Sequence, residues 1–449
     1  MPRPLTLAAH AAEDRPGLAT AAVVALGALA APLALVAARD PARIVFVTIA
    51  LAVAVVALAR VEIALMLLVA SAPLEDAVQL SGNPQLTITK VAGALCFASF
   101  ALYALSTHRR LYFDRLHVAV LLILALAMVS TLQAEDLASA QTTTIRYASY
   151  AALFIVVSQF VGDHRVQRRL AWALVISSGI ASAIALNRFL SGESTQAKLP
   201  YGDPNDLAYI LATTVPIAVW LLLRSSSRLA QAVLLLTLGF LFGAIVLTFS
   251  RGALVGLAAA LIWHVLTEQR GRLVVVAGVI VVAVVSTFLL IQLNPKQLQT
   301  GLNAKEKVAS QNVNTRLDAW SAAARLASDH PLGVGPGNFK LYYLKETGRP
   351  PGTETLAVVH DAYLDVAAEL GVGAMIVFLL YLGGSFMRAS VARARGNGPP
   401  GLATAVRTAL VIACVAGLFL SEQYYAPFWL LGALATAMWR EGEPMPDTR

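Results

Sequence analysis

Long apolar runs recur along this chain, and they constrain its fold more than any other feature. About 20 predominantly apolar residues in a helix cross the hydrocarbon core of a bilayer. Lipid offers no hydrogen bonds to a backbone, so a spanning segment must satisfy its own. Only 13% of the 449 residues are charged, against about 25% in an average soluble protein. We therefore predict an all-α, polytopic integral membrane protein.

The apolar runs predict about 12 to 14 transmembrane helices. The first run lacks an A-x-A exit and is too long for the core of a signal peptide, so we expect it to remain as a span. The candidate spans cover residues 17–37, 44–59, 61–77, 88–106, 116–133, 144–161, 169–190, 205–223, 229–249, 252–267, 272–293, 360–384, 402–421 and 424–440. We expect a helix bundle, one long loop and a C-terminal group of helices at 1–293, 294–359 and 360–449.

Arginines set the expected orientation. The net charge of +8 is compatible with nucleic acid as a partner, but the positions of the arginines argue against it. They gather in every second loop, as at Arg109, Arg168, Arg228 and Arg393, which is the distribution of cytoplasmic loops. Both termini are then cytoplasmic, and the 294–359 loop is periplasmic or external.

The 294–359 loop is the longest polar stretch, and a loop much longer than about 15 residues is uncommon unless it is functional. Residues 312–328 have helical character, with Asn314 or Thr315 as the expected cap. The Gly- and Pro-rich residues 329–339 predict a tight turn. We find no inverted pair of interrupted helices of the kind that transporters carry.

His360 follows the loop and opens the next apolar run. A histidine at a helix start is commonly a cap or a packed side chain. This one is predicted at the depth of a lipid head group, where a neutral imidazole can take a proton from a hydroxyl near neutral pH. Asp361 and Asp365 are near enough in sequence to orient it.

Arg146, Arg251 and Arg316 are candidate anion-binding residues. An arginine at membrane depth costs about 2.5–3.5 kcal/mol on insertion scales, so it usually faces the protein interior or a ligand. Its planar fork suits a phosphate or diphosphate. The alternatives are an ordinary surface position for Arg316 and snorkelling to the interface for the other two. The buried pair Asp365 and Glu369 predicts a partner such as an arginine.

The other sequence motifs give less information about function. Asp203 before Pro204 predicts a helix start with Asn205 or Asp206 as its cap. The G-x-G at 333–335 follows no predicted strand, so a dinucleotide fold is not indicated. No Walker loop and no metal-ligand cluster is found in the sequence.

Several short motifs follow one another around the long loop. They are SRGA at 250–253, R-x-x-x-W at 316–320, P-x-G-x-G-x-x-x-F at 331–339, H-x-x-Y-L at 360–364 and E-L-G at 369–371, with D-P-N-x-L-A at 203–208. In this order they resemble the O-antigen ligase and polymerase superfamily.

The resemblance implies inverting glycosyl transfer by a GT-C-like helical fold at the periplasmic face of a bacterial inner membrane. The donor would be a glycan on undecaprenyl diphosphate, and no cofactor or metal would be required. His360 would be the base that activates the acceptor hydroxyl, and Arg316 would act with it in catalysis. The residues expected to bind the diphosphate or the glycan are Arg251, Arg146, Asn205, Trp320 and Tyr363.

Three subclasses share this pattern: ligases that use lipid A–core, polymerases that extend a lipid-linked glycan, and protein O-oligosaccharyltransferases. Size and the compact single loop favour the ligase. The expected partners are then the lipid-linked donor, lipid A–core and the bilayer, without nucleic acid. A transporter of lipid-linked or anionic solutes is the alternative from another class, and a structural membrane scaffold is the third possibility.

Overall fold

The structure is a computed structural model that describes residues 41–78, 87–107, 111–160, 163–268, 272–348 and 358–441. These residues form helices and no strand. The predicted first span at 17–37 lies outside the described residues. The helices are α3 (Pro41–Ala59), α4 (Val61–Ser71), η1 (Ala72–Leu74), α5 (Ile88–Thr107), α6 (Arg115–Thr131), α7 (Leu137–Ser158), α8 (His164–Leu190), α9 (Pro204–Arg224), α10 (Arg228–Leu247), α11 (Arg251–Thr267), α12 (Arg272–Leu293), α13 (Pro295–Asp329), α14 (Phe339–Thr347), α15 (Ala362–Leu370), α16 (Val372–Arg395), α17 (Leu402–Ala416) and α18 (Ala426–Arg440).

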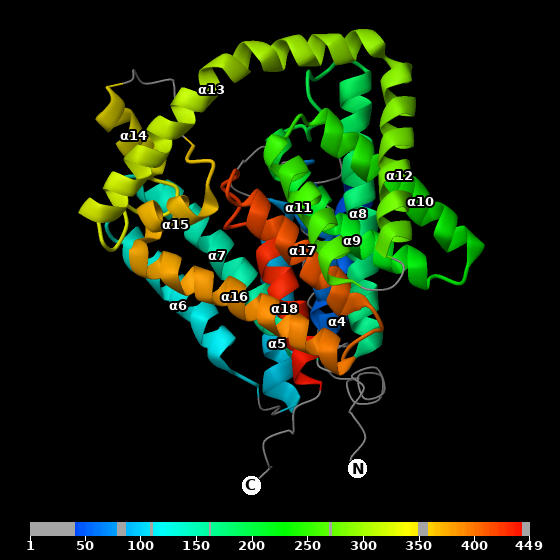
Figure 1. Cartoon of the computed structure of the whole chain (residues 1–449). Coiled ribbons are helices and arrows are strands. Elements are labelled where there is room, and N and C mark those ends of the chain that lie inside the picture. The colour runs from blue at the N-terminus through cyan, green and yellow to red at the C-terminus, as the bar shows by residue number, and fades with distance from the viewer. Residues whose placement is uncertain are drawn as a thin grey trace.

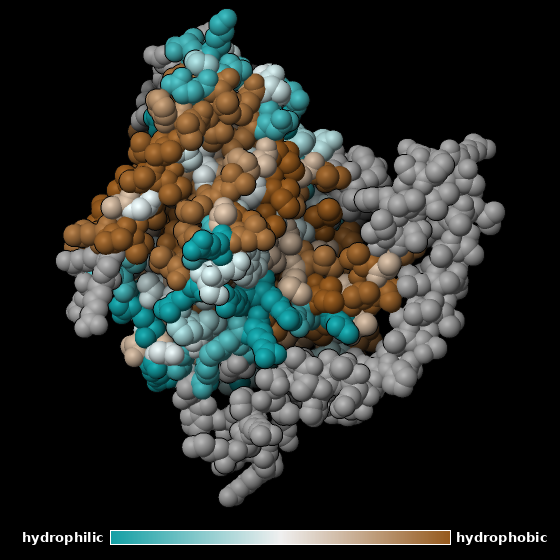
Figure 2. Space-filling view, turned by 90° about the vertical axis from the view of Figure 1, so that its right-hand side faces the viewer, coloured by the Kyte–Doolittle hydropathy of each residue, from teal (hydrophilic) through white to brown (hydrophobic). Residues whose placement is uncertain are grey.

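The all-helical membrane architecture predicted from the sequence is confirmed. Within the described residues, six helices are long and apolar enough to cross a membrane: α5, α8, α9, α10, α12 and α16. The structure also contains shorter apolar helices. The total of about 12 to 14 spans predicted from the sequence includes these shorter helices. On the side formed by α10 and α12, a broad apolar zone lies between hydrophilic surfaces (Figure 2). Large apolar side chains such as Leu236, Val284 and Phe288 are exposed there, as lipid contact requires.

Polar caps decide where several helices begin. A helix start leaves backbone N–H groups unpaired, and a short oxygen-bearing side chain satisfies them. Such side chains cap α6, α7, α8, α9, α10, α13 and α15, and they belong to Asp114, Asp136, Asp163, Asp203, Ser227, Asn294 and Asp361. The cap of α9 is therefore Asp203, and the prediction of Asn205 or Asp206 in that role is wrong.

Two predicted elements differ in their bounds. The single span expected at 360–384 is two helices, α15 and α16, which meet at Gly371 with φ 94°. The helix expected at 312–328 is the last part of α13, which starts after Asn294 rather than at Asn314 or Thr315. The polar side chains that suggested a cap in the middle of α13 do not end the helix, because its backbone hydrogen bonds continue without them.

α13 crosses one end of the bundle, from the end of α12 to α14 and α15 (Figure 1). We call this the α13 end; it carries the connections at 191–203, 248–250 and 417–425. Gln297 of α13 donates to the Ser194 carbonyl at 2.8 Å, and Gln196 donates to the Thr248 carbonyl at 2.8 Å. A second small core lies under the other half of α13 and contains Ala323, Phe339 and Val359. Both halves of α13 are thus fixed to the bundle.

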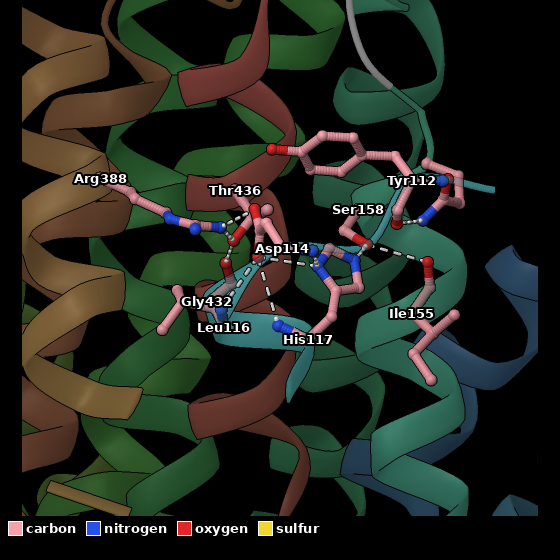
Figure 3. Close-up of polar contacts among 10 residues, drawn as sticks. Tyr112, Asp114, Leu116, His117, Ile155, Ser158, Arg388, Gly432 and Thr436 are labelled. Atoms are coloured by element: carbon pink, nitrogen blue, oxygen red, sulfur yellow. Dashed lines mark hydrogen bonds and ion pairs between the residues drawn. The ribbon is translucent and has the colours of Figure 1, made fainter. Parts of the chain in front are cut away.

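The opposite end of the bundle carries a polar cluster around Asp114 (Figure 3). Asp114 forms an ion pair with Arg388 of α16 at 2.8 Å and contacts His117 Nδ1 at 2.9 Å. His117 Nε2 lies 2.8 Å from Ser158 Oγ. The order Ser, His, Asp matches a nucleophilic triad. However, Ser158 and His117 are 0% exposed, so no substrate reaches the hydroxyl, and we assign the cluster a structural role.

Arg388→Met is expected to lower the free energy of unfolding by about 3–5 kcal/mol, because it leaves the buried Asp114 carboxylate without its cation. Thermal unfolding in detergent measures the change. Arg395→Met is the matched control, because Arg395 is an exposed arginine at the end of the same helix. Equal effects of the two substitutions would contradict a structural role for the ion pair.

Candidate functional site

Arg251 stands at the first position of α11, where the chain turns sharply out of α10. Phe249 in this turn has φ 55°, a left-handed backbone that non-glycine residues rarely adopt and that is enriched at functional sites. The Arg251 side chain is exposed, and no described residue forms an ion pair with it. A helix N-terminus also carries partial positive charge. The positive charge of the Arg251 guanidinium and the partial positive charge of the α11 N-terminus therefore lie close together.

Arg316 of α13 is half-buried and points its guanidinium toward the Phe419 carbonyl, at 3.5 Å from Nη1. Burial lowers the pKa of Arg316, and the neighbouring charge of Arg251 lowers it further. Two guanidinium groups are thus close enough to repel each other. Within the described part of the chain no carboxylate pairs with either of them. Such a pair of cations is stabilised when an anion binds between them.

His360 is half-buried at the start of α15 and has φ 55°. A left-handed backbone at a non-glycine residue costs about 1–3 kcal/mol and persists only when its surroundings hold it. Here the Ala362 N–H donates to the Gly417 carbonyl at 2.8 Å. The Asp361 carboxylate accepts from the N–H groups of Tyr363 and Leu364, both at 2.9 Å. The predicted orienting residue Asp361 therefore acts as a helix cap beside His360.

The connection at 417–425, between α17 and α18, brings these segments together. In Figure 1 it is the red-orange loop between α15 and α11. Its Gly417 carbonyl holds the start of α15, and its Phe419 carbonyl faces Arg316. A Cβ placed on Gly252 would lie 2.9 Å from Phe419 Cβ, so α11 starts in close contact with the same loop. The candidate catalytic residues Arg316 and His360 and the candidate binding residue Arg251 are therefore gathered around one loop.

This loop was missed by the sequence reasoning, which ran one span to residue 421 and began the next at 424. Two of its three contacts with the site are made by backbone carbonyls, which have no residue signature. The polar run at 421–425, between two apolar helices, was the available signal.

Asp365 and Glu369 are buried on α15, which lies outside the candidate membrane spans. The Asp365 carboxylate accepts from Gln423 Nε2 at 2.9 Å, and the Glu369 carboxylate accepts from the Phe339 N–H at 3.3 Å. Their partners are thus hydrogen-bond donors, and among the described residues no arginine forms an ion pair with either carboxylate. Burial raises the pKa of Asp365 to about 6, and burial together with the charge of Asp365 raises the pKa of Glu369. A raised pKa favours the neutral form of each carboxyl group, and hydrogen bonds from Gln423 and Phe339 stand in the place of a cation.

The glycine-rich turn at 330–338 lies flat against the junction of α15 and α16. The N–H groups of Val334 and Gly335 donate to the carbonyls of Ala368 and Glu369, each at 3.0 Å. Asn338, which is fully buried, accepts from the Asp136 N–H at 2.8 Å. The turn predicted at this motif is confirmed, and it holds α15, and hence the segment of His360, against α6 and α7.

Arg146 also contacts the 417–425 loop, but it differs from the other two arginines in having a carboxylate partner. Its Nη2 forms an ion pair with the buried Glu75 at 3.2 Å, and its guanidinium lies over the rings of Tyr424 and Tyr425 at 5.8 and 5.4 Å. A neighbouring cavity is lined by four carboxylates, those of Glu75, Asp76, Asp203 and Asp206. The charge of Arg146 is therefore already compensated, whereas the charges of Arg251 and Arg316 are not.

Of the remaining candidate binding residues, Trp320 and Tyr363 use their polar side-chain groups within the protein, and Asn205 lies in the first turn of α9. Trp320 donates its indole N–H to the Val359 carbonyl at 3.0 Å. Tyr363 donates its hydroxyl to the Cys414 carbonyl at 2.8 Å. The backbone N–H of Asn205 donates to the Asp203 carboxylate in the first turn of α9, at 2.7 Å. Their binding roles thus remain predictions.

A comparison with known protein families matches the part of the chain that contains Arg251, Arg316 and His360. Residues 235–379 match the family model described as O-Antigen ligase. Over these residues the chain is similar to the O-antigen ligase family. The matched region extends from α10 into α16 and includes Arg251, Arg316 and His360, while Arg146 and the 417–425 loop lie outside it. The chain matches no curated protein.

Proposed function

We propose that this chain is an O-antigen ligase that transfers a glycan from undecaprenyl diphosphate to a sugar hydroxyl of lipid A–core. The observation that carries the proposal is the pair Arg251 and Arg316, two neighbouring cations without a described carboxylate partner, on the same loop that holds the segment of His360. A diphosphate leaving group needs positive charge that is already in place when its bond breaks. The match to the O-antigen ligase family supports a lipid-linked glycan as the donor.

In the proposed reaction, the acceptor oxygen attacks the anomeric carbon of the donor sugar while His360 takes the hydroxyl proton. The bond from that carbon to the diphosphate oxygen breaks, and its electron pair leaves with undecaprenyl diphosphate. Attack from the side opposite to the leaving group inverts the anomeric centre. Arg251 and Arg316 stabilise the charge that grows on the diphosphate, and the proposal requires no metal.

We further propose that the α13 end faces the periplasm and that both termini are cytoplasmic, in a bacterial inner membrane. Arg388, Arg393 and Arg407 lie at the opposite end, with ion pairs to Asp114 and Glu268. An excess of arginine at that end is typical of the cytoplasmic side.

Purified protein in liposomes, incubated with the undecaprenyl-diphosphate glycan, lipid A–core and EDTA, is expected to form a glycan–lipid A–core conjugate of higher mass. The same reaction without lipid A–core is expected to leave the donor unchanged. A ladder of longer glycans on donor alone would make the enzyme a polymerase. No product in either reaction, with an active reference ligase beside it, would contradict glycosyl transfer and favour a transporter.

A further inference from the structure

We infer that Trp320 is a positioning residue that holds the His360 backbone in place, rather than a hydrogen-bond donor to the glycan. The inference rests on the proposed function, because it takes His360 as the base.

The indole N–H is the only polar group of a tryptophan side chain. In Trp320 it donates to the Val359 carbonyl at 3.0 Å. Val359 is buried in the small core under α13, so this carbonyl is enclosed by protein. Trp320 therefore has no polar group left for a sugar hydroxyl, and its hydrogen bond acts on the segment of His360.

The bond is placed where it controls His360. The Val359 carbonyl and the His360 nitrogen belong to one planar peptide group. The hydrogen bond from Trp320 orients this peptide group. It thereby restricts rotation about the N–Cα bond of His360, which defines its φ angle. Beyond His360, the Ala362 N–H is fixed by the Gly417 carbonyl at 2.8 Å. The left-handed conformation of His360 is thus held from both sides, by Trp320 and by the 417–425 loop.

Trp320 also connects the base to a cation. Arg316 and Trp320 are four residues apart on α13, so both side chains leave the same face of one helix. Arg316 faces the Phe419 carbonyl, and Trp320 holds the segment of His360. A rigid helix therefore sets the position of His360 relative to Arg316, and a displacement of about 1 Å at a reacting group costs roughly 100-fold in rate.

The test is Trp320→Phe, which keeps an aromatic ring and removes the N–H donor. We expect kcat for glycan transfer to fall by about 10- to 100-fold, with the donor KM within about two-fold of wild type. Trp220→Phe is the matched control, because Trp220 Nε1 donates to the Pro400 carbonyl at 2.9 Å at the opposite end of the bundle. We expect transfer by this control to be unchanged.

A double-mutant cycle separates positioning from general structure. If Trp320 acts through His360, Trp320→Phe should have no further effect on the residual transfer by His360→Ala. Independent, multiplicative losses would overturn the inference, as would equal losses in the Trp320 and Trp220 variants. An increased donor KM with unchanged kcat would assign Trp320 to glycan binding instead. Failure of the wild-type protein to form any product would overturn the proposed function, and this inference with it.

Discussion

His360→Ala is expected to reduce glycan transfer by about 10²–10⁴-fold, the usual contribution of a positioned general base. The substitution removes the proton acceptor, while the anchors of the segment at Val359 and Ala362 are backbone groups that remain. The rate of conjugate formation measures the effect, and thermal unfolding in detergent checks that the variant is folded. A folded His360→Ala protein with wild-type turnover would contradict the proposed mechanism.

The two cations are expected to behave similarly in activity and differently from structural arginines in stability. Arg251→Ala and Arg316→Ala should each reduce transfer by about 10²–10³-fold, as loss of one preorganised stabilising group does. Each change also relieves the repulsion between the two guanidinium groups, so the melting temperature of the free protein should not fall. Arg325→Ala, at an exposed arginine further along α13, is the control. A loss of stability that parallels the loss of transfer would instead indicate a structural role.

Gly333→Ala is expected to lower the free energy of unfolding by about 3 kcal/mol or more, and with it the yield of folded protein. The backbone at Gly333 has φ 79°, and an added Cβ would lie 2.1 Å from the Glu369 carbonyl oxygen. No rotamer change relieves an overlap with backbone. The turn at 330–338 would separate from the junction of α15 and α16, and His360 would lose its support. Thermal unfolding and the amount of monodisperse protein after detergent extraction measure the effect.

Substitutions at two other glycines separate the two causes of the expected instability of Gly333→Ala, the left-handed backbone and the overlap with α15. Gly348 has φ 62° with no atom within 4 Å of an added Cβ, so Gly348→Ala should show only the cost of the left-handed backbone. Gly373, in α16, has no neighbour within 4 Å and no left-handed φ, so Gly373→Ala should be close to neutral. If Gly333→Ala were as mild as Gly348→Ala, the close contact with α15 would not be important for stability.

Much of the fold was predictable because each membrane-spanning helix requires a long apolar segment, which can be recognised in the sequence. Each apolar run stands for a helix, since lipid allows few other conformations for a backbone. The bounds of α9, α11 and α12 are therefore close to the predicted spans at 205–223, 252–267 and 272–293. The break at Gly371 was not predictable in the same way, because its immediate neighbours Leu370 and Val372 are apolar and the break is stabilised by the turn at 330–338.

Sequence patterns also identified residues of the site, but not their relations to one another. Arg251, Arg316 and His360 were chosen for the chemistry of their side chains, which does not depend on the fold. The role expected of Arg146 rested on the same chemistry, and only the packing of α7 reveals Glu75 as its partner at 3.2 Å.

The sequence by itself determined the helical membrane architecture, the Gly–Pro turn and the side chains that are candidates for acid–base and phosphate chemistry. Only the tertiary structure decided which of these candidates lie together and what holds them. The anchors are backbone groups: the carbonyls of Gly417, Phe419 and Val359. Every residue carries such a group, so no residue type marks the ones that are used, and only folding selects them.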